Sequence, residues 1–170
     1  MIVVRELDRA LVRRSPFACG QPDLDRWLRE QAGQQDRRHN VRTVVAVDDE
    51  ADRVVGYHAT RAYEVAPARD GVRGAAGRRY PVPAVLIARM AVDLAYQGRG
   101  IGRLLLADAL TRIAGVARQV GFELVVVHAV DEAAARFYAA HGFRRFEDEP
   151  RALYLTTRDL LASAREAATR

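Results

Sequence analysis

The feature that most constrains the fold is the stretch at residues 96–105, YQGRGIGRLL, in which three glycines precede an apolar run. The residues before it predict a strand over 82–92, and those after it predict a helix from Ile101 to about Val120, closed by Gly121 in the left-handed conformation. In such a strand-to-helix turn, backbone N–H groups point outward at the positive end of the helix dipole. The stretch therefore predicts an anion site, with a tight turn that binds nothing as the alternative.

Two familiar phosphate motifs do not fit this glycine loop (residues 97–102). A dinucleotide fingerprint, G-x-G-x-x-G, requires glycine at position 103, which is occupied by Arg103. A Walker loop requires a lysine, and all 27 basic residues of this chain are arginines. A pyrophosphate of another kind remains as the expected ligand, and a tight turn that binds nothing remains as the alternative.

The remaining patterns predict an α/β protein with a single domain over residues 1–170. The uninterrupted apolar run at 124–129 is typical of a strand covered on both faces. Asp131 is a suitable N-cap for a helix that runs to about His141 and is closed by Gly142. Further strands are expected at 1–7, 43–47, 54–60, 143–146 and 152–155, further helices from Pro22 and over 157–168, and a loop over 66–81.

Charge and cysteine content limit the setting of the protein. The net charge of +5 is compatible with a polyanionic partner and equally with a plain solvated surface. The single cysteine, Cys19, permits no internal disulfide, which favours a reducing compartment. No apolar run approaches the ~20 residues of a membrane span. We therefore expect a cytoplasmic protein with no membrane contact.

Three motifs lie in a fixed order along the chain. The sequence RMAVD (89–93) ends the strand before the glycine loop, QGRGIG (97–102) matches the pattern Q/R-x-x-G-x-G/A, and DEAAARFY (131–138) is followed by HGF (141–143). Over roughly residues 40–155 this arrangement resembles the GCN5-related N-acetyltransferase (GNAT) superfamily. The resemblance implies a mixed, mostly antiparallel central sheet with helices on both faces, and acetyl-CoA as co-substrate.

A second resemblance covers the segment FACGQPDLDRWL at residues 17–28. It is similar to the opening pattern F-x-C-G-x-x-x-L-(D/N)-x-x-L of the toxin branch of these acetyltransferases. The resemblance implies a toxin that acetylates the amino group of aminoacyl-tRNA, a ribbon-helix-helix antitoxin as partner, and a homodimer. Cys19 itself is expected to be a small buried residue rather than a nucleophile.

The resemblance to the superfamily also assigns the acetyl-CoA contacts, and it implies no metal. Main-chain contacts with the acetyl and pantetheine groups fall to Met90, Ala91 and Val92. Pyrophosphate contacts fall to the glycine loop, with Arg103 adjoining: Gln97, Gly98, Arg99, Gly100, Ile101 and Gly102. The side chains of Gln97, Arg99 and Arg103 are expected to add hydrogen-bond donors.

Tyr138 is the expected catalytic residue. Phe137 follows Ala133 by one helical turn and is expected to face the core, which rotates Tyr138 about 100° away. The thiolate that leaves from CoA needs a proton, and a phenol with an ordinary pKa near 10 can donate one. The resemblance places a tyrosine in this role; a ring that only packs on acetyl-CoA is the alternative.

The acceptor is less constrained by the sequence. No general base stands out, and an α-amino group, with an unperturbed pKa of about 7.7–8.0, needs less help than a lysine near 10.4. Four arginines are candidates for tRNA phosphates: Arg37, Arg38, Arg78 and Arg79. An acetyltransferase of a small amine or protein N-terminus, and a non-catalytic CoA- or RNA-binding module, remain as alternatives.

Overall fold

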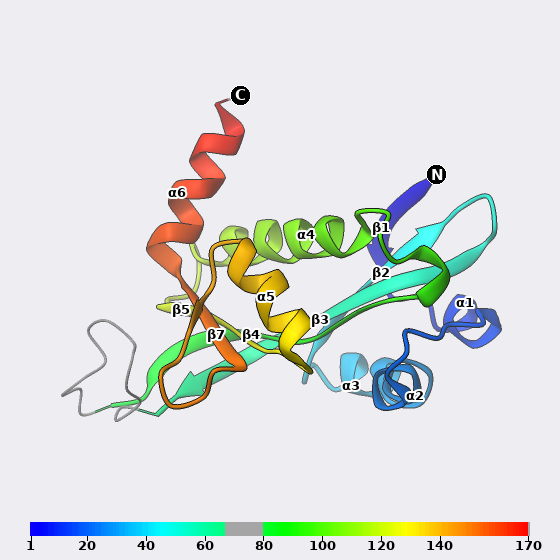
Figure 1. Cartoon of the computed structure of the whole chain (residues 1–170), viewed down its shortest axis with the longest axis horizontal. Helices are drawn as coiled ribbons and strands as arrows, with labels where there is room; N and C mark the ends of the chain where they lie inside the picture. The colour runs from blue at the N-terminus through cyan, green and yellow to red at the C-terminus, as the bar shows by residue number, and fades with distance from the viewer. Residues whose placement is uncertain (67–79, 170) are drawn as a thin grey trace. The chain divides into compact units, whose positions relative to one another are not determined.

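The computed structural model describes residues 1–66 and 80–169, and Figure 1 labels its elements. The strands are β1 (Ile2–Glu6), β2 (Arg42–Asp48), β3 (Arg53–Val65), β4 (Val82–Val92), β5 (Leu124–His128), β6 (Arg144–Arg145) and β7 (Ala152–Thr156). The helices are α1 (Arg9–Arg14), α2 (Pro22–Glu30), α3 (Ala32–Arg37), α4 (Ile101–Val116), α5 (Glu132–Ala140) and α6 (Thr157–Ala168), with the short 3-10 helix η1 (Leu94–Tyr96). In these described ranges, no helix is long and apolar enough to cross a membrane.

The strands form one mixed sheet in the order β1-β2-β3-β4-β5-β7-β6. The pairs β1–β2, β2–β3, β5–β7 and β7–β6 are antiparallel, whereas β4 and β5 pair in parallel, with Ala84 opposite Leu124 and Ile87 opposite Val127. This confirms the predicted α/β class with a mixed, mostly antiparallel sheet.

The chain forms two compact units. The first contains Met1–Arg61 and Ala88–Ala109, and the second contains Ala62–Ile87 and Leu110–Arg170. In the first unit, alternate residues of β2 enter two separate hydrophobic clusters. Val45 and Val47 pack with residues of α1 and α2, whereas Ala46 packs with Ile101 and Leu105 of α4. Since successive strand residues point to opposite faces, helices cover both faces of β2. The single domain over residues 1–170 stays a prediction.

The second unit contains the predicted buried strand and its capped helices. Residues 124–127 of β5 are all buried, as the uninterrupted apolar run predicted. The Asp131 side chain accepts a hydrogen bond from the Ala134 N–H at 2.8 Å, and Gly142 has a φ of 92° just after α5. Both ends of this helix are therefore closed as the sequence predicted.

Several boundaries differ from the prediction. Helix α4 ends at Val116, before the expected end near Val120, and Gly121 is not in the left-handed conformation. The Val116 carbonyl accepts hydrogen bonds from Gln119 and Val120, so turns finish the segment. Val116 and Val120 are 45% and 61% exposed, whereas Ile113 is 3% exposed, so the buried face of the helix does not continue past its observed end. The expected strand at 143–146 shrinks to Arg144–Arg145, and the helix expected from Pro22 is divided into α2 and α3. Helices α1 and η1 were not predicted.

Candidate functional site

The glycine loop has the backbone geometry of an anion cradle. Gly98 and Gly100 have φ values of 74° and 80°, which glycine adopts at little cost. The Gly100 carbonyl accepts the hydrogen bond of Leu104 N–H at 3.0 Å, so α4 begins directly after it. The N–H groups of its first turn have no partner within the helix. A Cβ atom added at Gly98 or Gly100 would meet nothing within 4 Å, so the space beside both residues is open.

The Gln97 side chain has a different role from the predicted one. Its Nε2 donates to the Cys19 carbonyl at 3.2 Å and to the Val92 carbonyl at 3.0 Å. An amide nitrogen has two hydrogens, so both are used within the protein. The Gln97 side chain therefore holds the start of the loop and has no donor left for a phosphate.

The Arg99 side chain of the glycine loop stacks on an aromatic ring of the preceding turn. Its guanidinium lies over the Tyr96 ring, 4.8 Å from the ring centroid. The Tyr96 hydroxyl donates to Asp48 at 2.9 Å, and this hydrogen bond lowers the pKa of the Asp48 carboxyl below its usual value. The Tyr96 N–H also donates to the Asp93 carbonyl at 2.8 Å, so both the backbone and the hydroxyl of Tyr96 are held. Stacking on this ring limits the positions open to Arg99. Arg103 is exposed on the first turn of α4.

The end of β4 packs on both sides of the sheet. Ala91 is buried among residues of α1 and α2, while Met90 and Val92 are partly buried against the cluster that contains Ile101 and Leu105. The side chains of these three residues are therefore used in packing. This packing is compatible with the expectation that main-chain atoms of the segment make the acetyl-CoA contacts.

Tyr138 lies in the second unit and faces inward, contrary to the prediction for Phe137. It is 7% exposed, shares the inner face of α5 with the fully buried Ala135, and contacts the rings of Phe137 and Phe143. Phe137 is only partly buried and packs on His141, with ring centroids 4.5 Å apart. Burial raises the pKa of the Tyr138 phenol well above its usual value. The phenol is therefore neutral at pH 7 and keeps a proton to donate.

The segment that resembles the toxin branch forms a rigid turn. Phe17 is buried and packs edge-on against Tyr57, and the Cys19 N–H donates to the Asp25 carboxylate at 2.9 Å. Gly20 has a φ of 91°. Burial, and after it the contact with Asp25, raises the pKa of the Cys19 thiol to about 11. Little thiolate exists at neutral pH, in agreement with the structural role expected for Cys19.

Two of the four candidate tRNA-binding arginines can be placed. Arg37 ends α3 and Arg38 follows it; both are exposed. Their neighbour Arg42 is already paired with Asp36 at 2.8 Å. Arg78 and Arg79 lie outside the described residues. Within the ranges that the structure covers, no group of His, Cys, Asp and Glu could hold a metal ion.

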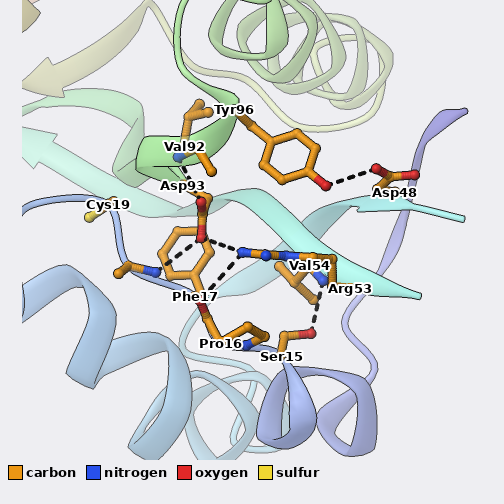
Figure 2. A network of polar contacts seen from close by, with 12 residues as sticks. Ser15, Pro16, Phe17, Cys19, Asp48, Arg53, Val54, Val92, Asp93 and Tyr96 are labelled. Atoms are coloured by element: carbon orange, nitrogen blue, oxygen red, sulfur yellow. Dashed lines mark hydrogen bonds and ion pairs between the residues drawn. The ribbon is translucent and has the colours of Figure 1, made fainter. Parts of the chain in front are cut away.

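Sequence reasoning missed a polar network beside the loop, shown in Figure 2. At its centre is Asp93, whose carboxylate accepts hydrogen bonds from Arg53 at 2.8 Å, Ala95 N–H at 2.9 Å and Ala18 N–H at 3.2 Å. The signal in the sequence was an acid directly after a mostly apolar strand, followed by the turn that leads into the glycine loop.

The family of the chain follows from comparison with known proteins. The sequence model described as "Acetyltransferase (GNAT) domain" matches residues 39–145. The chain therefore belongs to the GNAT family of acetyltransferases. It is 36% identical over 146 residues to a protein of Mycobacterium tuberculosis (strain ATCC 25618 / H37Rv) named tRNA-acetylating toxin, covering 86% of this chain and 87% of that one. It is 28% identical over 162 residues to the probable toxin TacT of Sinorhizobium fredii (strain NBRC 101917 / NGR234), covering 90% of each.

Solved structures share the fold at lower identity. A tyrosine-to-phenylalanine mutant of KacT has a TM-score of 0.86 at 22% identity, covering 95% of this chain and 98% of its own. AtaT complexed with acetyl-methionyl-tRNAfMet has a TM-score of 0.83 at 24% identity, covering 96% and 99%. AtaTR bound with AcCoA has a TM-score of 0.80 at 24% identity, covering 95% and 97%. These likenesses confirm the predicted GNAT fold.

Proposed function

We propose that this acetyltransferase is a toxin that uses acetyl-CoA to acetylate the α-amino group of aminoacyl-tRNA and so blocks translation. The observation that carries the proposal is the open glycine loop at the start of α4, with left-handed backbone at Gly98 and Gly100. The likeness to the tRNA-acetylating toxin extends over 86% of the chain and so includes more than the acetyl-CoA motifs.

The residues present fit acetyl-CoA. The pyrophosphate would lie on the N–H groups of Gly98, Arg99, Gly100, Ile101 and Gly102, with the Arg99 guanidinium and Arg103 nearby. Gln97 would support the loop through its side chain. Main-chain atoms of Met90, Ala91 and Val92 would bind the acetyl and pantetheine groups.

Tyr138 would supply the proton that the reaction needs. The neutral α-amine attacks the thioester carbon, a C–N bond forms and the C–S bond breaks. The sulfur leaves as a thiolate and takes the phenolic proton of Tyr138. The amine loses a proton to solvent, and the Tyr138 phenolate takes one back from solvent, so the enzyme returns to its starting state. No dedicated base is required because the pKa of the amine is close to neutral. The Tyr138 phenol is protonated at physiological pH, as a phenol with an ordinary pKa near 10 also is, so the proton is available for transfer.

The wider setting follows from the same function. A toxin of this kind needs an antitoxin, which we propose to be a ribbon-helix-helix protein, and we propose that the enzyme is a homodimer. Charged tRNA is a cytoplasmic substrate, so the cytoplasm is the expected compartment.

Labelled acetyl-CoA tests the acceptor directly. Purified enzyme is expected to transfer the labelled acetyl group to a pool of charged tRNA. Hydrolysis of the aminoacyl ester should then release the label as acetyl-amino acid. Uncharged tRNA is the control and should stay unlabelled. Transfer to small amines or peptide N-termini, with none to charged tRNA, would instead establish the alternative acetyltransferase function. No transfer to any amine would favour a binding module.

Arg37 and Arg38 are expected to contact tRNA phosphates. Reversing both charges (Arg37→Glu with Arg38→Glu) should raise the KM for charged tRNA by about tenfold or more at low salt, because each arginine that neutralises a phosphate contributes to affinity. The KM for acetyl-CoA should not change. The matched control reverses two exposed arginines of α6, Arg158 and Arg165. If the two double variants raised the KM for charged tRNA equally, the effect would be one of net charge, and Arg37 and Arg38 would have no specific role in tRNA binding.

A further inference from the structure

The segment that resembles the toxin branch is joined to the glycine loop by main-chain and side-chain hydrogen bonds. The Ala18 carbonyl accepts from Leu94 N–H at 2.9 Å, and the Cys19 carbonyl accepts from the Gln97 amide. In the other direction, the Ala18 N–H donates to the Asp93 carboxylate. Both sides of the contact belong to the first unit. Residues 18–19 are therefore hydrogen-bonded to the turn that leads into the glycine loop, although the two segments are distant in sequence.

Asp93 is the residue on which this contact converges. Its side chain is 5% exposed, and its two oxygens accept from three donors: Ala18 N–H, Ala95 N–H and the Arg53 guanidinium. These donors come from the N-terminal segment, from η1 and from the start of β3. Arg53 also donates to the Pro16 carbonyl at 3.4 Å. A buried carboxylate with three charge-assisted or main-chain donors fixes the relative positions of all three segments.

We propose that Asp93 is a positioning residue for acetyl-CoA, which acts by holding the turn before the glycine loop against residues 16–19. The inference rests on the proposed function in one respect, namely that the loop binds the pyrophosphate of CoA. The glycines make the loop flexible in the unfolded chain, and its N–H groups bind an anion well only if they are held in one arrangement before binding. Residues 17–20 then contribute to acetyl-CoA binding. Their likeness to the toxin branch is therefore not evidence for the identity of the acceptor.

Asparagine at position 93 separates this role from simple packing. It has nearly the shape of aspartate, but one oxygen becomes an NH₂ group. The oxygen can then face either Ala95 or the pair Ala18 and Arg53, and the NH₂ group meets donors on the other side. Asp93→Asn should therefore loosen the loop. The matched control is Asp52→Asn, which makes the same change in an exposed Arg–Asp pair, where Asp52 binds Arg14 at 2.8 Å.

The experiment measures CoA binding by calorimetry without any acceptor, and acetyl-CoA KM and kcat with charged tRNA. Asp93→Asn is expected to raise the CoA dissociation constant and the acetyl-CoA KM by about tenfold or more, with kcat at saturation within about twofold of the wild type. Asp52→Asn should change none of these values. A folded Asp93→Asn protein with a lower kcat but an unchanged acetyl-CoA KM and CoA dissociation constant would overturn the proposal.

A second variant keeps the test decisive if Asp93→Asn does not fold. Gln97→Met removes both donors of an exposed side chain in the same turn and should also raise the CoA dissociation constant, by a smaller factor. Unchanged CoA affinity in a folded Asp93→Asn or in Gln97→Met would overturn the positioning role while leaving the proposed function intact. A wild-type protein that binds no CoA would overturn the proposed function itself.

Discussion

Replacing Tyr138 with phenylalanine is expected to lower kcat by about 10²–10⁴-fold, the usual contribution of a positioned general acid. The phenol is buried and its raised pKa keeps it protonated, so the variant removes a proton donor and nothing else of similar size. The dissociation constant for CoA should stay within about twofold, because the proposed phosphate contacts lie at the glycine loop. Acetyl-transfer assays measure kcat, and calorimetry measures the dissociation constant for CoA, so the two effects are determined separately.

The matched control for this variant is Tyr154→Phe, which removes the hydroxyl of another buried tyrosine. Tyr154 lies in β7 and packs against Phe146. The control variant is expected to keep the turnover of the wild type. In growing cells, expression of the wild type should arrest growth, and Tyr138→Phe should relieve the arrest. Normal turnover by purified Tyr138→Phe would remove the catalytic assignment and leave Tyr138 as a ring that packs on the acetyl-CoA site.

The backbone of the site could be predicted from the sequence because its signals are local. Asp131 and Gly142 act within one helical turn of their own positions, so the ends of α5 follow from residue type. The glycine spacing also located the strand-to-helix turn, in which Gly98 and Gly100 have positive φ while Gly102 already belongs to α4. Strand β4 was predicted with its observed ends because its apolar run is bounded by Pro81 and by Asp93.

The side-chain arrangement could not be predicted because it depends on contacts distant in sequence. Phe137 and Tyr138 are adjacent aromatic residues, and helical spacing from Ala133 favoured the wrong one. The inner face of α5 is set instead by Ala135, which is 0% exposed and one turn before Tyr138. The Gln97 amide could have met a phosphate on sequence grounds alone. Only the fold brings the Cys19 carbonyl within its reach.

The conformation of the glycine loop leads to the second large effect. Substituting alanine at both Gly98 and Gly100 is expected to weaken acetyl-CoA binding by about a hundredfold, because the left-handed conformation costs a residue with a Cβ about 1–2 kcal/mol at each position. Neither Cβ would meet an atom within 4 Å, so crowding within the protein does not contribute. The added cost reduces the population of the loop conformation that binds, and the apparent affinity falls with it.

Gly115 and Gly121 provide a control with the same chemical change. An added Cβ at either residue also meets nothing within 4 Å, and neither residue has a positive φ. The double variant Gly115→Ala with Gly121→Ala should therefore bind CoA as the wild type does, and alanine at position 115, inside α4, should stabilise the helix by up to about 1 kcal/mol. Calorimetry of CoA binding and thermal unfolding compare the two double variants. If the loop variant bound CoA with wild-type affinity, the left-handed backbone at Gly98 and Gly100 would not be what holds the pyrophosphate, and the proposed acetyl-CoA site would lose the observation that carries it.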